Sequence, residues 1–192
     1  MRNNALTDAV ALRGRGVAFE PLAARPAVQV RWQLTPEGWF EASFEVRLPP
    51  GAAWNVNPAY SRTDYRENWG LWEHDVVELF LQPRPHPDVA SGPYLELELS
   101  PLGQPFALLI EEPARRYAAP DTLAFLRENS LTETAWRVRV AVQVPGYAPG
   151  APLFGNLTVC LGPAGARSYW GLTLNEDGEV DFHRPQDFVQ LV

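Results

Sequence analysis

The feature that most constrains the fold is a strict alternation of apolar and polar residues along two segments. In the first segment the apolar positions are Phe40, Ala42, Phe44, Val46 and Leu48. In the second segment they are Trp136, Val138, Val140, Val142 and Val144. Successive side chains of a β-strand point to opposite faces, so this period predicts strands with one face in a core and the other in water.

Further segments carry similar apolar patterns between turn signals. They are Val28–Leu34, Asp75–Gln82, Tyr94–Ser100, Phe106–Glu112, Leu157–Leu161 and Tyr169–Leu174. The 19 prolines are spread along the chain, which disfavours long helices. Only Pro120–Asn129 is a candidate for a short helix. Short strands separated by turns predict an all-β fold, a two-sheet antiparallel β-sandwich with little helix.

The length of 192 residues suits one large β domain. We expect residues 28–192 to form that domain and residues 1–27 to be an N-terminal extension packed on it. Cys160 is the single cysteine, which excludes an internal disulfide and favours a buried, inert thiol. No apolar run has the length of a signal peptide or a membrane span, which favours a cytoplasmic protein.

The net charge of −7 excludes two classes of partner, nucleic acids and anionic membranes, because both require a basic surface. Glu96 and Glu98 alternate along one predicted strand, and Arg137 and Arg139 alternate along another. If these strands are neighbours, the four side chains form cross-strand ion pairs on a solvent-exposed face.

Tryptophan is abundant, with seven residues in the chain. Trp54, Trp69, Trp72 and Trp170 fall in predicted loops or strand ends. An indole ring can lie flat against a sugar while carboxylates or Arg bind its hydroxyls, and the segment 69–78 contains both kinds of group. The alternative is that these rings only cover the rim of the core.

The ordered motifs of the chain resemble a known family. The motifs are Leu71–Leu81, Tyr94–Gly103, Trp136–Pro145, Gly155–Leu157, Tyr169–Trp170 and Asp181–Pro185. Together they are similar to the family 9 carbohydrate-binding modules and their DOMON-like relatives, from about Val28 to Leu191. The resemblance implies a sandwich of the DOMON-like or immunoglobulin-like jelly-roll type.

The resemblance also implies a binding site. In members that bind sugar, two Trp rings enclose a terminal saccharide and polar side chains hold its hydroxyls. Trp72 and Trp170 match the rings, and Glu78 matches the acid that follows the first ring. Arg167 stands where the family has Asn. The expected function is therefore non-catalytic binding of a carbohydrate or another small polar ligand.

The resemblance also raises haem and calcium as alternative ligands. Some DOMON relatives bind haem through Met and His, but the single Met is Met1, and a bis-His site needs His74 and His183 to converge. Family 9 modules often hold structural calcium, for which Asp64, Glu67 and Asp177 could serve. We expect no other cofactor and assign no metal site.

Two further classes of function remain as alternatives. An enzyme is not predicted, because the sequence has no nucleophile-elbow, P-loop or dinucleotide-binding motif. An interaction domain without sugar activity is compatible with the same pattern, because a fold does not determine function. The sequence leaves the oligomeric state undetermined.

Overall fold

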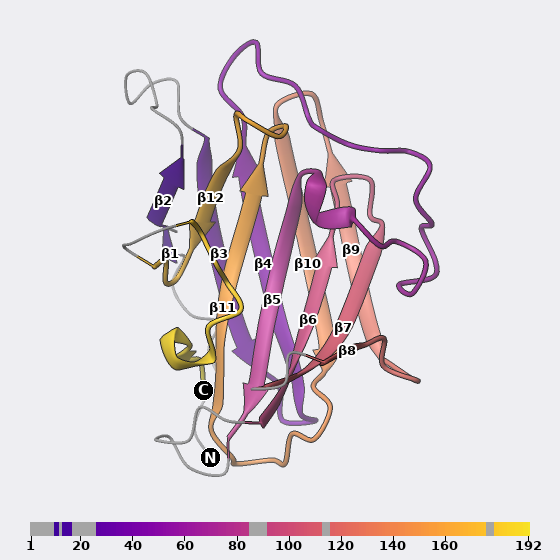
Figure 1. The fold of residues 1–192 in the computed structure, drawn as a ribbon, viewed down its shortest axis with the longest axis vertical. Helices are drawn as coiled ribbons and strands as arrows, with labels where there is room; N and C mark the ends of the chain where they lie inside the picture. The colour runs from indigo at the N-terminus through magenta and orange to yellow at the C-terminus, as the bar shows by residue number, and fades with distance from the viewer. Residues whose placement is uncertain (1–9, 12, 17–25, 85–91, 113–115, 176–178) are drawn as a thin grey trace.

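The computed structural model describes residues 10–11, 13–16, 26–84, 92–112, 116–175 and 179–192. They form two antiparallel sheets packed face to face, with β5 and β6 in front of β4 and β10 in Figure 1. Sheet A has five strands in the order β1-β3-β4-β10-β9. Sheet B has eight, in the order β2-β12-β11-β5-β6-β7-β8 with β13 also paired to β11. The predicted antiparallel β-sandwich is confirmed.

Sheet A contains both segments of strict alternation. Its strands are β1 Val10–Ala11, β3 Ala27–Leu34, β4 Trp39–Arg47, β10 Ala135–Gln143 and β9 Phe125–Leu131. The register pairs Val46 with Trp136 and Phe44 with Val138, so the apolar sides of β4 and β10 coincide. These side chains point toward sheet B and form the core between the sheets. The charged sides of the same strands form the outer face of sheet A.

Sheet B is buried on both faces along its central strands. Its strands are β2 Arg13–Gly16, β12 Ser168–Gly171, β11 Leu153–Leu161, β5 Val76–Pro83, β6 Gly92–Leu99, β7 Pro105–Glu112, β8 Arg116–Ala118 and β13 Val189–Gln190. Val77, Leu79 and Leu81 point into the core between the sheets. Val76 and Phe80 point the other way, into a second buried cluster on the outer face. That outer face is therefore covered by other parts of the chain.

The predicted helix at Pro120–Asn129 is wrong. Residues Phe125–Leu131 are strand β9, which pairs with β10 from Phe125 opposite Val142 to Leu131 opposite Trp136. The Asn129 side chain also accepts a hydrogen bond from the indole of Trp136 at 2.7 Å. Pairing with an existing strand outweighs local helix propensity here. The described helices are two short 3-10 turns, η2 Leu71–Glu73 and η3 Pro185–Asp187, and no described helix is long and apolar enough to cross a membrane.

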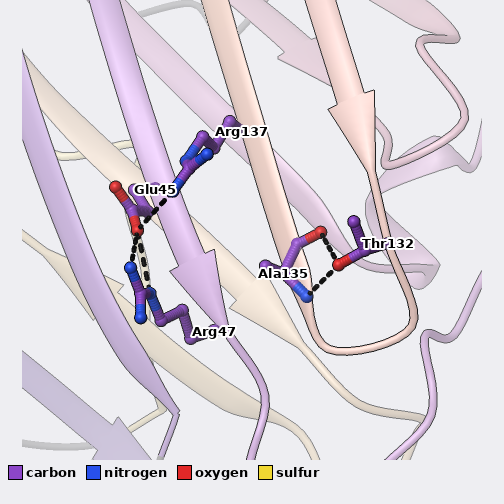
Figure 2. Close-up of polar contacts among 5 residues, drawn as sticks. All are labelled: Glu45, Arg47, Thr132, Ala135 and Arg137. Atoms are coloured by element: carbon purple, nitrogen blue, oxygen red, sulfur yellow. Dashed lines mark hydrogen bonds and ion pairs between the residues drawn. The ribbon is translucent and has the colours of Figure 1, made fainter.

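The predicted ion pairs between Glu96 or Glu98 and the arginines of β10 are also wrong. Glu96 and Glu98 lie on β6 in sheet B, whereas β10 belongs to sheet A. Arg139 instead pairs with Glu41, and Arg137 with Glu45. Figure 2 shows Glu45 between Arg47 and Arg137, and it shows the hydroxyl of Thr132 bonded to the backbone of Ala135 in the β9–β10 turn.

The described part of the N-terminal region consists of edge strands. Strand β1 pairs with β3 in sheet A, and β2 pairs with β12 in sheet B. This region therefore contributes backbone hydrogen bonds to both sheets. The division into an extension of residues 1–27 and a domain of residues 28–192 stays a prediction.

Candidate functional site

A pocket of about 910 Å³ lies on the outer face of sheet B. Its lining comes from the segment around η2, from strands β5, β6, β7, β8, β11 and β12, from the turn after β11, and from residues 180–183. A smaller hollow of about 440 Å³ lies on the outer face of sheet A, where Arg31, Glu128, Arg137 and Arg139 line it. Ligand sites are concave and mostly apolar with a few polar groups, so the larger pocket is the candidate site.

One group of aromatic side chains in the pocket comes from the segment around η2, and it packs on Phe106 of β7. The rings of Trp69 and Trp72 meet edge to face, with centroids 4.9 Å apart, and both contact Phe106. Trp69 is 63% exposed, which is unusual for so large an apolar residue. Gly70 has φ of 89°, a left-handed conformation that lets the chain turn between the two indoles.

A second group of aromatic side chains comes from β12 and the C-terminal segment. Tyr169 contacts Phe182, with ring centroids 6.0 Å apart, and Phe182 contacts Phe80 at the base of the pocket. The Nδ1 atom of His183 lies 3.0 Å from the hydroxyl of Tyr94, which fixes the imidazole at this position. The pocket therefore has aromatic surface contributed by segments far apart in the sequence.

Three buried carboxyl groups lie together at the base of the pocket. Glu78 on β5 is directly opposite Glu98 on β6, and Glu96 is two residues before Glu98 on the same side of the strand. Oxygens of the three groups lie within 4.8 Å of one another, and the residues are 3%, 5% and 0% exposed for Glu78, Glu96 and Glu98. Glu78 and Glu96 line the pocket itself.

Burial raises the pKa of all three carboxyl groups, because an ionised carboxylate loses its hydration. The pKa of Glu96 reaches about 8, with burial as the main cause and the charge of Glu78 as the second. Glu78 is the best supported of the three, because it accepts hydrogen bonds from Thr158 and from the thiol of Cys160. Among the described residues, the only hydrogen-bond partner of the Glu98 carboxyl is the carboxyl of Glu96, and no N–H group or hydroxyl donates to it.

Arg167 links two chain segments that line the pocket. Its guanidinium donates to the carbonyl oxygens of Trp72, His74 and Gly162. These three bonds join the η2 segment to the turn that follows β11. The same side chain lines the pocket, and its charge acts to lower the pKa of Glu78 and Glu98 against the larger effect of burial.

Three of the four site residues predicted from the sequence line this pocket: Trp72, Glu78 and Arg167. The fourth, Trp170, is 8% exposed and belongs to the core between the sheets. Side chains alternate along β12, so Trp170 points inward with its register partner Val159, and Tyr169 points into the pocket. The structure therefore does not place Trp170 opposite Trp72; the aromatic ring that β12 contributes to the pocket is that of Tyr169.

Sequence reasoning missed Glu96 and Glu98 as site residues and assigned them to a solvent-exposed face. A signal was present in the neighbouring strand, because Val76 and Phe80 are apolar on the same side as Glu78. A strand that is apolar on both sides indicates a sheet whose outer face is covered. Glutamates on that covered face are therefore buried.

Groups relevant to haem or metal binding also lie here. His74 and His183 both line the pocket, and Nε2 of His183 is 3.9 Å from the Glu96 carboxyl. Cys160 is buried, and burial raises the pKa of its thiol, as expected for an inert cysteine. Of the residues named for calcium, Asp177 lies outside the described residues, and the Asp64 carboxyl accepts a bond from the backbone of Arg66. The expectations on cofactors stay predictions.

Comparison with known proteins connects this architecture to one family of folds. No family model and no curated protein matches the sequence. A solved family 9 carbohydrate-binding module from Caldicellulosiruptor kristjanssonii, in complex with cellotriose, is 14% identical, with a TM-score of 0.57 over 95% of this chain and 80% of that one. A module of the same family and organism in complex with glucose is 15% identical, with a TM-score of 0.52 over 85% of this chain and 75% of that one. The chain thus has the fold of the family 9 carbohydrate-binding modules, as its sequence motifs indicated.

Proposed function

We propose that this protein is a non-catalytic carbohydrate-binding protein, and that the pocket on sheet B is its sugar site. The observation that carries the proposal is the joint presence of exposed aromatic rings and carboxyl groups in one pocket. The proteins that share the fold were solved with cellotriose and with glucose. Those ligands belong to the neighbours, and they support the same class of ligand for this chain.

The pocket offers each kind of contact that a sugar requires. The rings of Trp69, Trp72 and Tyr169 supply apolar surface on which the C–H face of a pyranose can stack. Glu78 and Glu96 supply oxygens that accept hydrogen bonds from hydroxyl groups. We propose that a terminal sugar stacks on Trp72, with Tyr169 in the role that the family resemblance implied for Trp170.

A glycoside hydrolase is the enzyme class closest to this arrangement, because it also uses a pair of carboxyl groups. Such an enzyme needs one carboxyl that stays protonated and one that stays ionised, so their environments must push the two pKa values apart. Here burial raises the pKa of Glu78, Glu96 and Glu98 together. The pKa directions therefore do not distinguish the two classes, and binding is favoured because the proteins that share the fold are carbohydrate-binding modules.

The test is to titrate the protein with glucose, cellobiose and cellotriose and to monitor binding by tryptophan fluorescence and calorimetry. We expect Trp72→Ala to weaken binding about tenfold, since loss of a stacked ring removes about 1.4 kcal/mol. Because the Trp72 side chain is only partly buried, the free energy of unfolding of the Trp72→Ala variant should differ little from that of the wild type. Absence of binding to all three sugars, or unchanged affinity in Trp72→Ala, would contradict the proposal.

Trp170→Ala is the matched control for this experiment. Its ring fills the core between the sheets, so its removal should lower the free energy of unfolding by about 3–5 kcal/mol. Chemical denaturation of both variants separates the two roles. If Trp72→Ala destabilises the protein as much as Trp170→Ala does, Trp72 is a core residue and the proposed site is wrong.

A further inference from the structure

The three carboxyl groups at the base of the pocket differ from the other paired glutamates in their lack of an arginine partner within the described residues. The charge of Arg167 acts on Glu78 and Glu98, but its guanidinium donates to three backbone carbonyls. Among the described residues, no arginine forms an ion pair with Glu78, Glu96 or Glu98. In the part of the chain that the structure describes, the only basic group within ion-pair distance is the imidazole of His183, beside Glu96.

Glu98 makes this arrangement more than a cluster of acidic residues. Its side chain is 0% exposed, and among the described residues no N–H group or hydroxyl donates to its oxygens, which have only the neighbouring carboxyl of Glu96 as a hydrogen-bond partner. A buried polar group without a partner is costly, and natural structures rarely keep one unless a ligand, ion or water completes it. One oxygen of Glu98 lies within 4.8 Å of oxygens of Glu78 and Glu96, which line the pocket.

We propose that Glu78, Glu96 and Glu98 bind a protonated primary amine, so that the sugar recognised in this pocket is an amino sugar. This inference rests on the proposed function, because it names the class of ligand for the same site. It adds a requirement that neutral sugars do not meet, namely a positive charge next to the stacked ring.

The geometry of the three carboxyl groups suits an ammonium group. An ammonium has three N–H donors, and acceptors about 2.8 Å away in tetrahedral directions lie about 4.6 Å from one another. The carboxyl oxygens here all lie within 4.8 Å of one another, and those of Glu96 and Glu98 are within hydrogen-bond distance, so the three groups are close enough to surround one nitrogen once Glu96 and Glu98 separate slightly. Each of the three glutamates can therefore accept one hydrogen bond from the same nitrogen.

The remaining lining favours an organic cation over a metal ion. Calcium takes six to eight oxygen ligands, which three carboxyl groups supply only if all are bidentate or water completes the shell. The other side chains at this end of the pocket include Phe80, Leu108 and Cys160, which are poor ligands for calcium. Aromatic faces, in contrast, attract an organic cation and stack on the ring that carries it.

The experiment compares glucosamine with glucose and N-acetylglucosamine at pH 7 by calorimetry on the full chain. Glucose has a hydroxyl in place of the amine, and N-acetylglucosamine has a neutral amide there. We expect glucosamine to bind at least about tenfold more tightly than either, because hydrogen bonds between charged groups are about twice as strong as neutral ones. We expect Glu98→Gln to bring the ratio of affinities close to one.

Two further variants make the result decisive. Glu96→Gln removes a second carboxyl and should also reduce the preference, which tests the cluster independently of Glu98. Glu128→Gln is the control, because Glu128 lies on β9 in sheet A with its side chain 79% exposed. This control should leave the ratio of affinities unchanged.

The outcomes separate the inference from the function on which it rests. Equal affinity for glucose and glucosamine would overturn the inference and keep the sugar site, whereas binding of none of the three sugars would overturn both. A preference for glucosamine that persists in Glu98→Gln and Glu96→Gln would place the amine elsewhere and overturn the inference. So would a preference that disappears when a chelator is added, because the three carboxyl groups would then hold a metal ion.

Discussion

The outer faces of the two sheets carry the same sequence pattern in opposite environments. On β4 in sheet A, Glu41 and Glu45 project from the outer face and pair with Arg139 and Arg137. On β6 in sheet B, Glu96 and Glu98 also project from the outer face, but they are buried at the base of a pocket. The alternation of glutamates along a strand therefore indicates which face they occupy. It does not indicate whether that face is exposed to solvent.

The outer faces of the two sheets also differ in the pKa of their carboxyl groups. Partial burial acts to raise the pKa of Glu41, but hydrogen bonds from Gln33 and Arg139 lower it overall. The hydrogen bond from Arg47 is the main cause that lowers the pKa of Glu45. Burial raises the pKa of Glu96 and Glu98 instead. Sheet A thus stabilises ionised carboxylates, and sheet B stabilises neutral carboxyl groups or a bound cation.

The largest expected effect of this contrast is a loss of stability as the pH rises. The pKa of Glu96 is about 8 in the folded protein against 4.5 for an ordinary glutamate, so the unfolded chain releases this proton first. Between about pH 4.5 and 8 the folded state holds more protons, and each unit of pKa difference lowers the free energy of unfolding by about 1.4 kcal/mol. Urea denaturation at several pH values measures this loss, and a free energy of unfolding that rises steadily from pH 5 to pH 8 would contradict it.

The next largest effect is expected from Glu98→Gln. The amide has the same shape, carries no charge and can donate hydrogen bonds to Glu96 or Glu78, so the variant should be more stable than the wild type. We expect a gain of about 1–3 kcal/mol at pH 8, the size of the penalty for an unsatisfied buried polar group. The free energy of unfolding of Glu98→Gln should also depend less on pH than that of the wild type. A destabilised Glu98→Gln would mean that the carboxyl has a stabilising partner.

The smallest effect is expected on sheet A. Glu45→Gln weakens exposed ion pairs with Arg47 and Arg137, whose side chains are 62% and 64% exposed. Such pairs contribute between 0 and about 1 kcal/mol, and added salt screens them. Denaturation at low and high salt should show a small loss that disappears in high salt. A loss as large as the gain in Glu98→Gln would remove the contrast between the two faces.

Strand positions could be predicted from the sequence because they depend on local alternation. The segments at Phe40–Leu48 and Trp136–Val144 were placed within a residue or two of β4 and β10. The assignment of Pro120–Asn129 failed because β9 is held by its pairing with β10, which lies outside the segment. A strand at the edge of a sheet has a weak pattern of its own, so its identity depends on a neighbour.

The site could be predicted only in part, for a related reason. Trp72, Glu78 and Arg167 were found from spacing and family resemblance, and all three line the pocket. Trp170 was assigned without its parity along β12, which places Tyr169 in the pocket instead. The burial of Glu96 and Glu98 depends on segments far away in sequence, such as Leu71 and Phe188, that cover the outer face of sheet B. A single strand contains no information on that cover.

The most direct test of the account is a nuclear magnetic resonance titration that follows the indole N–H signals of the seven tryptophans. Glucose and glucosamine are added in turn to the labelled protein. The account predicts that the signals of Trp69 and Trp72 shift, whereas those of Trp136 and Trp170 in the core stay in place. No shift with either sugar, or shifts confined to Trp39 on sheet A, would contradict a sugar site on sheet B.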